Sequence, residues 1–274
     1  MPRWRRLLLT GAAGEIGSVL RPALRGTAER LRWHDIRPVE GAEAGEEVMR
    51  GDLRDPAAAA EAVEGVDCLL HFAGIPRETG GTPEDILATN VVGTHHLFEA
   101  ARRAGVRRIV FASSNHAIGF YPAGRFVGTE EPGRPSGHYG LSKVFGETLG
   151  RLLADKHGME VACLRIGAFR ARPGNVRELG AWISRGDMAR LGRCCVEAPG
   201  FGFLVIYGIS ANPRAMWGGD EAARAAVGYV PRDDAEDYAA EVEGVPVPGG
   251  PVAARFHGGS VAAMGFEGDP GRVA

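Results

Sequence analysis

Short apolar runs alternate with helical stretches from the start of the chain to about residue 167, and this alternation limits the possible folds more than any other feature. The sequence predicts strands at 6–9, 31–35, 46–50, 66–72, 107–113 and 161–166. It predicts helices at 16–24, 57–63, 85–103 and 139–157. Strands that alternate with helices in this way are joined by right-handed crossovers. We therefore expect an α/β fold with a doubly wound parallel sheet and helices on both faces.

The pattern loosens after Gly167. A helix at 181–196, a strand at 203–209 and a last helix at 234–243 are expected there. From Val245 onward Gly, Pro and Ala dominate and the periodicity is lost, which is typical of loosely attached segments. The sequence thus predicts one domain over residues 1–244, followed by a flexible tail over residues 245–274.

Composition excludes several functional classes. The formal net charge of -2 gives no electrostatic reason to expect binding to nucleic acid or to an acidic membrane surface. The apolar run within residues 1–9 ends at Thr10 and Gly11, so it is too short for the core of a signal peptide and fits a first strand better. No stretch approaches the roughly 20 apolar residues of a membrane span. The four cysteines lack metal-ligand spacing and read as free thiols in a reducing compartment. We expect a cytoplasmic protein without a metal site.

Glycines at 11, 14 and 17 lie directly between the first strand and the first helix. In a dinucleotide-binding turn, Gly11 would permit the tight turn, Gly14 would let backbone amides approach a pyrophosphate, and Gly17 would allow close packing of helix on strand. The free N–H groups and the dipole of the helix N-terminus favour an anion at that place. The pattern therefore predicts a dinucleotide site in a Rossmann-type domain, although its spacing differs by one residue from the usual G-x-G-x-x-G.

Two acidic residues follow the next strands. Asp35 closes the second strand, where an acid hydrogen-bonds the adenosine ribose, and its charge would repel a 2′-phosphate, so NAD is favoured over NADP. A simple turn aspartate is the other interpretation, and the nearby Arg37 argues for NADP. Asp52, beside Leu53, could meet the adenine amino group or could cap a helix. Small residues at the end of the fourth strand, in Phe72-Ala73-Gly74, would let the cofactor lie across the edge of the sheet.

Tyr139 and Lys143 are four residues apart in a predicted helix and so lie on one face of it. A cation beside a phenol favours the phenolate and lowers the pKa of the phenol. Such a phenolate can take the proton of a substrate hydroxyl while a cofactor takes the hydride. The Y-x-x-x-K pattern alone is common by chance, and it gains weight only in combination with the nucleotide turn and with the hydroxyl of Ser114.

In this order, these motifs resemble the extended short-chain dehydrogenase/reductase superfamily, which includes the NAD-dependent epimerase/dehydratase family. The matching residues are Thr10–Gly17, Asp35, 51–53, 71–74, Asn90, Ser113, Ser114, Tyr139, Lys143 and 165–167. The resemblance implies that NAD contacts fall on the matching positions. They are Gly11, Ala13, Gly14, Glu15, Ile16, Gly17, Asp35, Asp52, Leu53, Phe72, Ala73, Gly74, Asn90, Tyr139, Lys143 and Ile166.

Within that superfamily the chain is most similar to uronate dehydrogenases. The shared sequence motifs lie in residues 111–116, 118–121, 139–143, 145–147, 165–167, 210–212, 228–231 and 235–236. The resemblance implies NAD-dependent oxidation of the anomeric hydroxyl of glucuronate or galacturonate, a hexuronate, to an aldarolactone. It also places the elements that bind the substrate mainly after residue 167. We further expect a homo-oligomer.

The same resemblance assigns roles to site residues. Tyr139 would be the base, with Lys143 as its partner and Ser114 orienting the substrate oxygen. Asn115 and His116 would bind sugar hydroxyls and Arg177 the carboxylate, for which an Arg fork is well suited. From the residues alone, His116 could equally be a packed histidine, and Arg177 could belong to a solvated Arg-rich face.

Two positions depart from the pattern of the group. Pro76 and Ala168 stand where serines tend to lie near the substrate, and neither side chain can donate a hydrogen bond. The resemblance therefore implies fewer contacts to the substrate here.

Three other functions are considered for these motifs. Nucleotide-sugar epimerases and dehydratases use the same catalytic residues, but they generally carry a longer C-terminal region than this chain has. A dehydrogenase of another sugar would also fit. A non-catalytic dinucleotide sensor is disfavoured because both Tyr139 and Lys143 are present.

Overall fold

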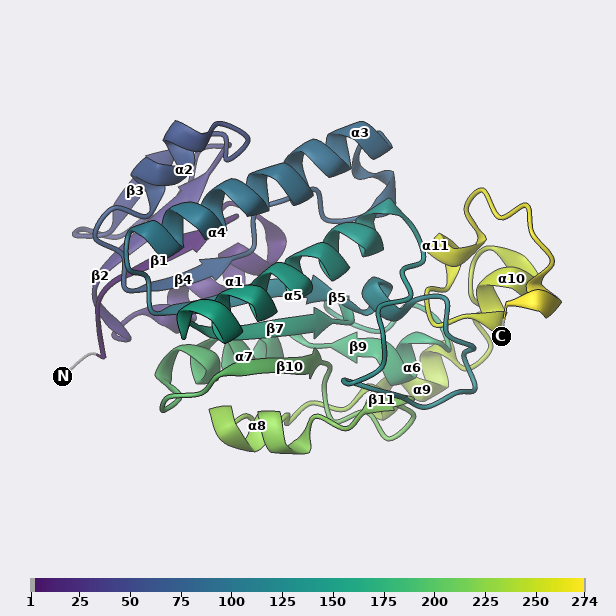
Figure 1. Cartoon of the computed structure of the whole chain (residues 1–274). Coiled ribbons are helices and arrows are strands. Elements are labelled where there is room, and N and C mark those ends of the chain that lie inside the picture. Colours follow the sequence, from purple (N-terminus) through teal and green to yellow (C-terminus); the bar gives the residue numbers. More distant parts are fainter. Residues whose placement is uncertain (1–2, 274) are drawn as a thin grey trace.

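The computed structural model describes residues 3–273, which build a parallel sheet of seven strands between two layers of helices (Figure 1). The strands follow one another across the sheet in the order β3-β2-β1-β4-β5-β7-β10. Their bounds are β1 Trp4–Thr10, β2 Ala28–Asp35, β3 Glu47–Arg50, β4 Cys68–His71, β5 Arg108–Ser114, β7 Glu160–Ile166 and β10 Phe203–Gly208. This confirms the predicted doubly wound parallel sheet. Met1 and Pro2, which begin the segment considered as a signal peptide, and Ala274, which ends the predicted tail, lie outside the described residues.

Helices cover both faces of this sheet. The helices α1 Glu15–Leu24 and α7 Arg185–Glu197 pack together on one face, and α2 Pro56–Ala62, α4 Gly93–Arg103 and α5 His138–His157 lie on the other. In β1, Leu7 and Leu9 enter the core under the first layer, while Leu8 enters the core under the second. A strand that is covered on both sides reads as a continuous apolar run, and this explains why β1 is visible in the sequence.

The predicted helix at 85–103 is interrupted in one place. A capping box between Thr82 and Asp85 starts α3 Pro83–Ile86, which continues through a π-helical turn, Leu87–Val92, into α4. Turns of this kind widen the helix locally and are frequent at functional sites. Here the widened turn carries the buried Asn90.

The part of the chain after residue 167 differs more from the prediction. The helix expected at 181–196 begins only at Arg185, because Ser184 accepts a hydrogen bond from the Asp187 amide and caps α7. The residues before it form α6 Glu178–Ala181 and the short strand β9 Trp182–Ile183, which pairs with β8 Ala168–Phe169. Helix α8 Glu221–Val227 was not predicted. The helix expected at 234–243 is a 3-10 turn, Ala235–Tyr238, followed by α9 Ala239–Val242.

Part of the C-terminal segment packs against the rest of the fold. Helices α10 Gly250–Arg255 and α11 Ser260–Ala263 flank Phe256 and His257, which are 0% and 5% exposed. Composition could not reveal this packing, because the partners of His257 lie 40, 80 and 132 residues earlier in the chain. The domain boundary at residue 244 stays a prediction.

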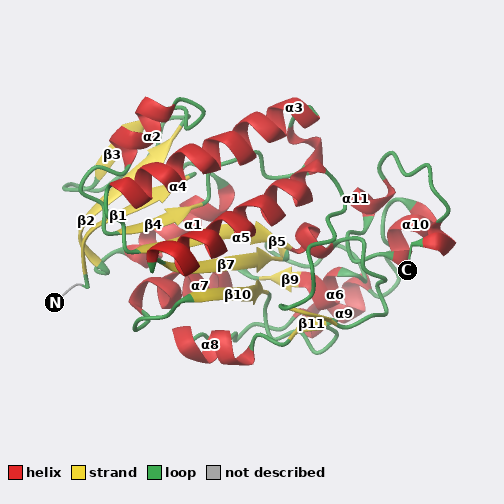
Figure 2. Ribbon diagram, in the orientation of Figure 1, coloured by secondary structure: helices red, strands yellow, loops and turns green. Residues whose placement is uncertain are grey.

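The carboxyl ends of the strands define one end of the molecule. Figure 2 shows the arrowheads of β5, β7 and β10 directed toward the end where α6, α9, α10 and α11 gather. Loops that follow parallel strands meet at this edge, where ligands of such sheets bind. None of the helices among residues 3–273 is long and apolar enough to cross a membrane.

Candidate functional site

The turn between β1 and α1 requires glycine at positions 11 and 17. Gly11 has a φ of 74°, and a Cβ on it would lie 2.5 Å from the carbonyl carbon and oxygen of Phe72. A Cβ on Gly17 would lie 2.2 Å from the Gly11 oxygen. Gly14 is the extended N-cap of α1, which starts at Glu15, with Ile16 packing toward the core. The amide end of α1 is thereby held close to the ends of β1 and β4, as the glycine spacing predicts.

Asp35 lies at the end of β2 and holds this turn. Its Oδ2 accepts a hydrogen bond from the Ala13 amide at 2.9 Å, and its Oδ1 accepts one from the Arg37 amide at 2.9 Å. Arg37 in turn donates from Nη2 to the Ala13 carbonyl at 2.8 Å. A carboxylate has about four acceptor positions, so Asp35 retains capacity for a further donor such as a ribose hydroxyl.

Asp52 follows β3 and is engaged by Arg54. The guanidinium donates to both carboxylate oxygens of Asp52, with Nη2 2.6 Å from Oδ2, and this pairing lowers the pKa of Asp52. The capping role considered for Asp52 belongs to Asp55, which accepts from the Ala57 amide at the start of α2. Asp52 therefore stays an ionised acceptor beside the buried Leu53.

Asn90 fastens the loop after β4. Its Oδ1 accepts from the Ile75 amide at 2.8 Å, and its Nδ2 donates to the Ile75 carbonyl at 3.0 Å and to Ser142 Oγ at 3.2 Å. Gly74 has a φ of 146°, and a Cβ on it would lie 2.7 Å from Asn90 Oδ1. The residues after Phe72 and Ala73 are thus fixed against helix α5.

The three expected catalytic side chains meet at the edge of the sheet. Ser114 ends β5, Tyr139 is in the first turn of α5, and Lys143 follows one turn later. The Ser114 hydroxyl is close enough to Tyr139 to act on the pKa of its phenol. Lys143 Nζ lies 5.3 Å from the centroid of the Tyr139 ring and 5.2 Å from that of Phe111.

The electrostatics of this group differ from the prediction. Burial raises the pKa of Tyr139 to about 12, and the nearby Ser114 hydroxyl only partly opposes this. Burial also lowers the pKa of Lys143 to about 8. In the protein chain alone the predicted lowering of the Tyr139 pKa by Lys143 is therefore not found, because the ammonium lies beside the ring and both groups have lost their water. Tyr139 is a neutral phenol near pH 7.

His116 and Asn115 lie in a 3-10 turn directly after Ser114. Ser136 Oγ lies 3.0 Å from His116 Nδ1, and the His116 ring meets the Tyr139 ring edge-on at 5.9 Å. Burial, and secondly the charge of Arg177, lower the pKa of His116 to about 3, so the imidazole is neutral. It can donate or accept one hydrogen bond without carrying charge.

Arg177 is a half-buried cation whose guanidinium is held by acceptors of the protein. Its Nε donates to the His257 carbonyl at 2.8 Å, and Nη2 donates to the same oxygen. With the Asn115 amide oriented to satisfy both of its ends, Asn115 Oδ1 accepts from Nη2 at 2.7 Å and Nδ2 donates to the Ile166 carbonyl at 3.1 Å. Burial lowers the pKa of Arg177 to about 10.

Among residues 3–273, no carboxylate forms an ion pair with this guanidinium. The neighbouring Glu178 forms its ion pair with Arg170 at 3.3 Å, and no ion pair within residues 3–273 involves Arg177. Arg177 is therefore not part of a solvated Arg-rich face. The structure brings it together with Asn115 and His116 at the carboxyl edge of the sheet.

Several residues that support the site were not predicted. Glu78 accepts from the amides of His138 and Tyr139, both at 2.8 Å, and so satisfies the start of α5. Ser136 holds His116, and His257 holds Arg177. These residues lie in irregular segments without a motif, so only the contacts across the fold identify them. Pro76 is exposed in the loop after β4 and Ala168 is half-buried in β8.

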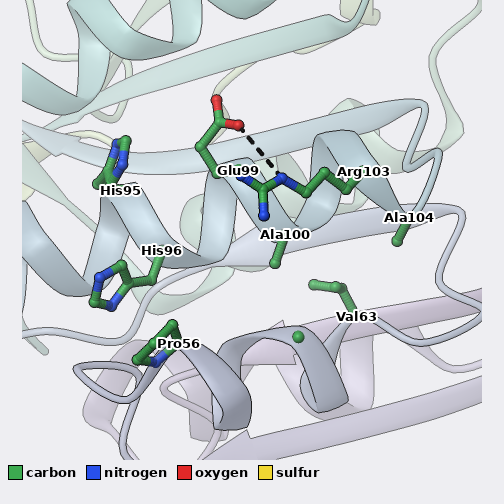
Figure 3. A pocket seen from close by; sticks show the side chains of 9 residues that line it. Pro56, Val63, His95, His96, Glu99, Ala100, Arg103 and Ala104 are labelled. Atoms are coloured by element: carbon green, nitrogen blue, oxygen red, sulfur yellow. Dashed lines mark ion pairs between the residues drawn. The ribbon is translucent and has the colours of Figure 1, made fainter.

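A separate pocket of about 430 Å³ lies between α2 and α4, on the outer face of the sheet (Figure 3). His95 and His96 face it, and Glu99 forms an ion pair with Arg103 at 4.0 Å along one side. None of the expected cofactor or catalytic residues lines it. Within residues 3–273 no group of His, Cys, Asp or Glu could hold a metal ion.

Comparison with known proteins adds an independent finding. The sequence model of the NAD dependent epimerase/dehydratase family matches residues 7–177. A uronate dehydrogenase from Pseudomonas putida is 43% identical over 265 residues, which are 96% of this chain and 97% of that protein. A glucuronic acid dehydrogenase structure from Chromohalobacter salexigens has a TM-score of 0.88 at 39% identity, covering 98% of this chain and 99% of that one. A mutant uronate dehydrogenase from Agrobacterium tumefaciens, complexed with NAD, has a TM-score of 0.86 at 40% identity, covering 94% and 97%.

Proposed function

The chain belongs to the NAD dependent epimerase/dehydratase family, and from that premise we propose that it oxidises the C1 hydroxyl of a hexuronate, glucuronate or galacturonate, to an aldarolactone with NAD. The family, the cofactor class and the resemblance to uronate dehydrogenases predicted from the motifs are confirmed by the relatives. The roles of individual residues are part of the proposal.

The observation that carries the substrate class is the guanidinium of the half-buried Arg177. Burial disfavours a charge unless a counter-ion or strong acceptors compensate for the lost water. Arg177 has the His257 carbonyl and the Asn115 amide oxygen as acceptors, and it forms no ion pair among residues 3–273, although the charge of nearby Glu178 partly opposes the effect of burial on its pKa. A substrate carboxylate would supply the missing negative charge, and a planar guanidinium is well suited to hold it.

The residues at the amino end of α1 fit NAD. The turn has no room for a Cβ on Gly11 or Gly17, so the backbone stays open to a pyrophosphate at the positive end of α1. Asp35 would accept a hydrogen bond from the ribose, and its charge would disfavour a 2′-phosphate. When bound, NAD supplies the nicotinamide that accepts a hydride.

The catalytic group is proposed to act through proton transfer at Tyr139. The phenolate of Tyr139, which forms when the phenol gives its proton to water, takes the proton of the C1 hydroxyl beside Ser114. Lys143, whose Nζ lies 5.3 Å from the centroid of the Tyr139 ring, would stabilise the phenolate by its positive charge once the phenol has lost its proton. Neutral His116 and Asn115 would hold sugar hydroxyls next to Tyr139. Pro76 and Ala168 would add no hydrogen bond to the substrate.

The activity is tested by mixing purified protein with NAD or NADP and glucuronate, galacturonate, glucose or galactose, and following the absorbance of the reduced cofactor. We expect a signal with uronates and NAD, and a much weaker one with neutral sugars or NADP. A signal with neutral sugars and none with uronates would overturn the substrate class.

Nucleotide-sugar epimerases and dehydratases remain the alternative function within the same family. The match to the Pseudomonas putida uronate dehydrogenase, which covers 96% of this chain and 97% of that protein, favours the dehydrogenase over this alternative. Tight calorimetric binding of a UDP-sugar, together with no turnover of free uronates, would favour this alternative.

We also infer that the protein is a cytoplasmic homo-oligomer. Light scattering after gel filtration measures the oligomeric state, and cell fractionation with an antibody locates the protein. A monomer, or a secreted protein, would contradict these inferences.

A further inference from the structure

The C-terminal segment, defined as residues 250–265, lies against the guanidinium of Arg177. We propose that this segment is a wall of the substrate site, and that the hydrogen bond between Trp217 and His257 positions Arg177 for the carboxylate. The inference rests on the proposed function, because it assumes that Arg177 binds a uronate.

Two hydrogen bonds of the imidazole ring fix the position of His257. Trp217 Nε1 donates to His257 Nδ1 at 3.0 Å, and His257 Nε2 lies 2.8 Å from the Arg125 carbonyl oxygen, which can only accept. These two contacts require a neutral imidazole with its proton on Nε2. Burial lowers the pKa of His257, in agreement with a neutral ring. Trp217 and His257 are 6% and 5% exposed, so water does not compete for this bond.

The main-chain carbonyl of His257 in turn fixes the guanidinium of Arg177. The His257 carbonyl accepts from both Nε and Nη2 of the guanidinium. Gly259 packs against the same side chain, since a Cβ on it would lie 3.1 Å from Arg177 Cδ and Nε. Because Asn115 accepts the other proton of Nη2, only Nη1 lacks a partner among residues 3–273. The guanidinium is thus fixed so that Nη1 is its available donor group.

The segment is docked by backbone hydrogen bonds to the loop after Ser114. Ala123 N donates to the Arg255 carbonyl at 2.8 Å, His257 N to Tyr121 at 3.0 Å, and Gly258 N to Gly119 at 2.7 Å. The ring of Phe256 meets that of Phe120 edge-on at 5.4 Å. This pairing explains how a segment rich in Gly, Pro and Ala keeps a fixed place.

The C-terminal segment also packs behind His116, on the other side of the site from Arg177. A Cβ on Gly258 would lie 2.6 Å from Ser136 Cβ, and Ser136 Oγ lies 3.0 Å from His116 Nδ1. The C-terminal segment therefore backs both Arg177 and His116. Its contacts orient these groups and do not touch the proton-transfer residues, so loosening it is expected to weaken binding of the uronate and to leave turnover nearly unchanged.

The variants Trp217→Phe and His257→Leu test this positioning. Trp217→Phe keeps an aromatic ring next to Tyr207 and removes the N–H donor, and His257→Leu removes the acceptor. Loss of one neutral hydrogen bond corresponds to about a three- to tenfold change in an equilibrium constant. We expect the KM for glucuronate to rise by about that factor in both variants, with kcat and the KM for NAD nearly unchanged.

Two controls separate positioning from general loss of stability. The first control is Trp4→Phe, at the other end of the sheet. It also removes a buried indole hydrogen bond, which Trp4 Nε1 donates to the Val196 carbonyl at 2.9 Å. It should leave the KM for glucuronate unchanged. His257→Asn places an amide oxygen near the position of Nδ1 and should restore a KM close to that of the natural protein. Thermal denaturation of each variant shows whether it is folded at the assay temperature.

Hydrogen exchange supplies a readout that does not depend on turnover. If the docked segment favours uronate binding, uronate must favour the docked segment by the same factor. Saturating glucuronate should therefore slow exchange of the amides of Ala123, His257 and Gly258, and glucose should not. An unchanged KM in His257→Leu, an equal rise in the KM for NAD, or unaltered exchange would each overturn the inference. No uronate turnover by the natural protein would instead overturn the proposed function.

Discussion

Replacing Arg177 with leucine removes the cation that we assign to the substrate carboxylate. A charge-assisted hydrogen bond contributes about 1.5–3 kcal/mol, and in this buried place the upper value applies. Roughly 3 kcal/mol corresponds to about a hundredfold loss in kcat/KM. We expect this loss for glucuronate, with kcat/KM for glucose unchanged within about twofold, since glucose has no carboxylate to lose.

The same substitution should leave the protein folded. Burial lowers the pKa of Arg177 from 12.5 to about 10, a cost to the charged form of roughly 3 kcal/mol that leucine avoids. Against this, the His257 carbonyl and Asn115 lose their donor, at about 1–3 kcal/mol for each buried group. The two effects nearly cancel, so the free energy of unfolding should change by at most a few kcal/mol.

Steady-state rates with glucuronate and glucose, together with urea unfolding curves, measure both effects. Equal losses in kcat/KM for the two sugars would mean that Arg177 supports the fold of the site and does not bind the carboxylate. An unchanged rate with glucuronate would refute the assignment outright. Arg177→Lys, which keeps the charge but cannot make the guanidinium contacts to the His257 carbonyl and Asn115, should fall between leucine and the natural residue.

Further predictions concern the cofactor site and the proton transfer. Asp35→Ala should raise the KM for NAD and allow turnover with NADP, as measured with both cofactors; an unchanged preference would contradict the role of this carboxylate. Lys143→Ala should reduce turnover severely and move the pH optimum upward, because Tyr139 loses the charge that favours its phenolate; an unchanged pH profile of kcat/KM would argue against this. Gly17→Ala should lower the midpoint of thermal unfolding and weaken NAD binding, because its Cβ would lie 2.2 Å from the Gly11 oxygen; normal NAD titration would show that the turn can adjust.

The predicted part of the fold is the part in which local sequence and burial agree. Strands such as β1 are covered on both faces and read as apolar runs, and the glycine turn has strict steric demands, so both are visible in the sequence. Asp35 and Ser114 could be placed because parallel strands bring their carboxyl ends to one edge.

The remaining features depend on contacts between distant segments. The place of His257 follows from Trp217 and Arg177, and the neutral state of His116 follows from its burial and from a cation some sixty residues away. The pKa of Tyr139 could not be predicted either, because helical spacing fixes the face of Lys143 but not the water around the phenol. Composition alone suggested a flexible tail, because Gly and Pro mark loops even where backbone pairing fixes them.

The most direct test of the proposed reaction follows the hydrogen at C1 of the substrate. Glucuronate carrying deuterium at C1 is incubated with the protein and NAD, and the reduced cofactor and the sugar product are analysed by NMR. The account predicts deuterium at C4 of the reduced nicotinamide and one equivalent of a lactone product. Deuterium that remains on the sugar, or a product altered at another carbon, would contradict it.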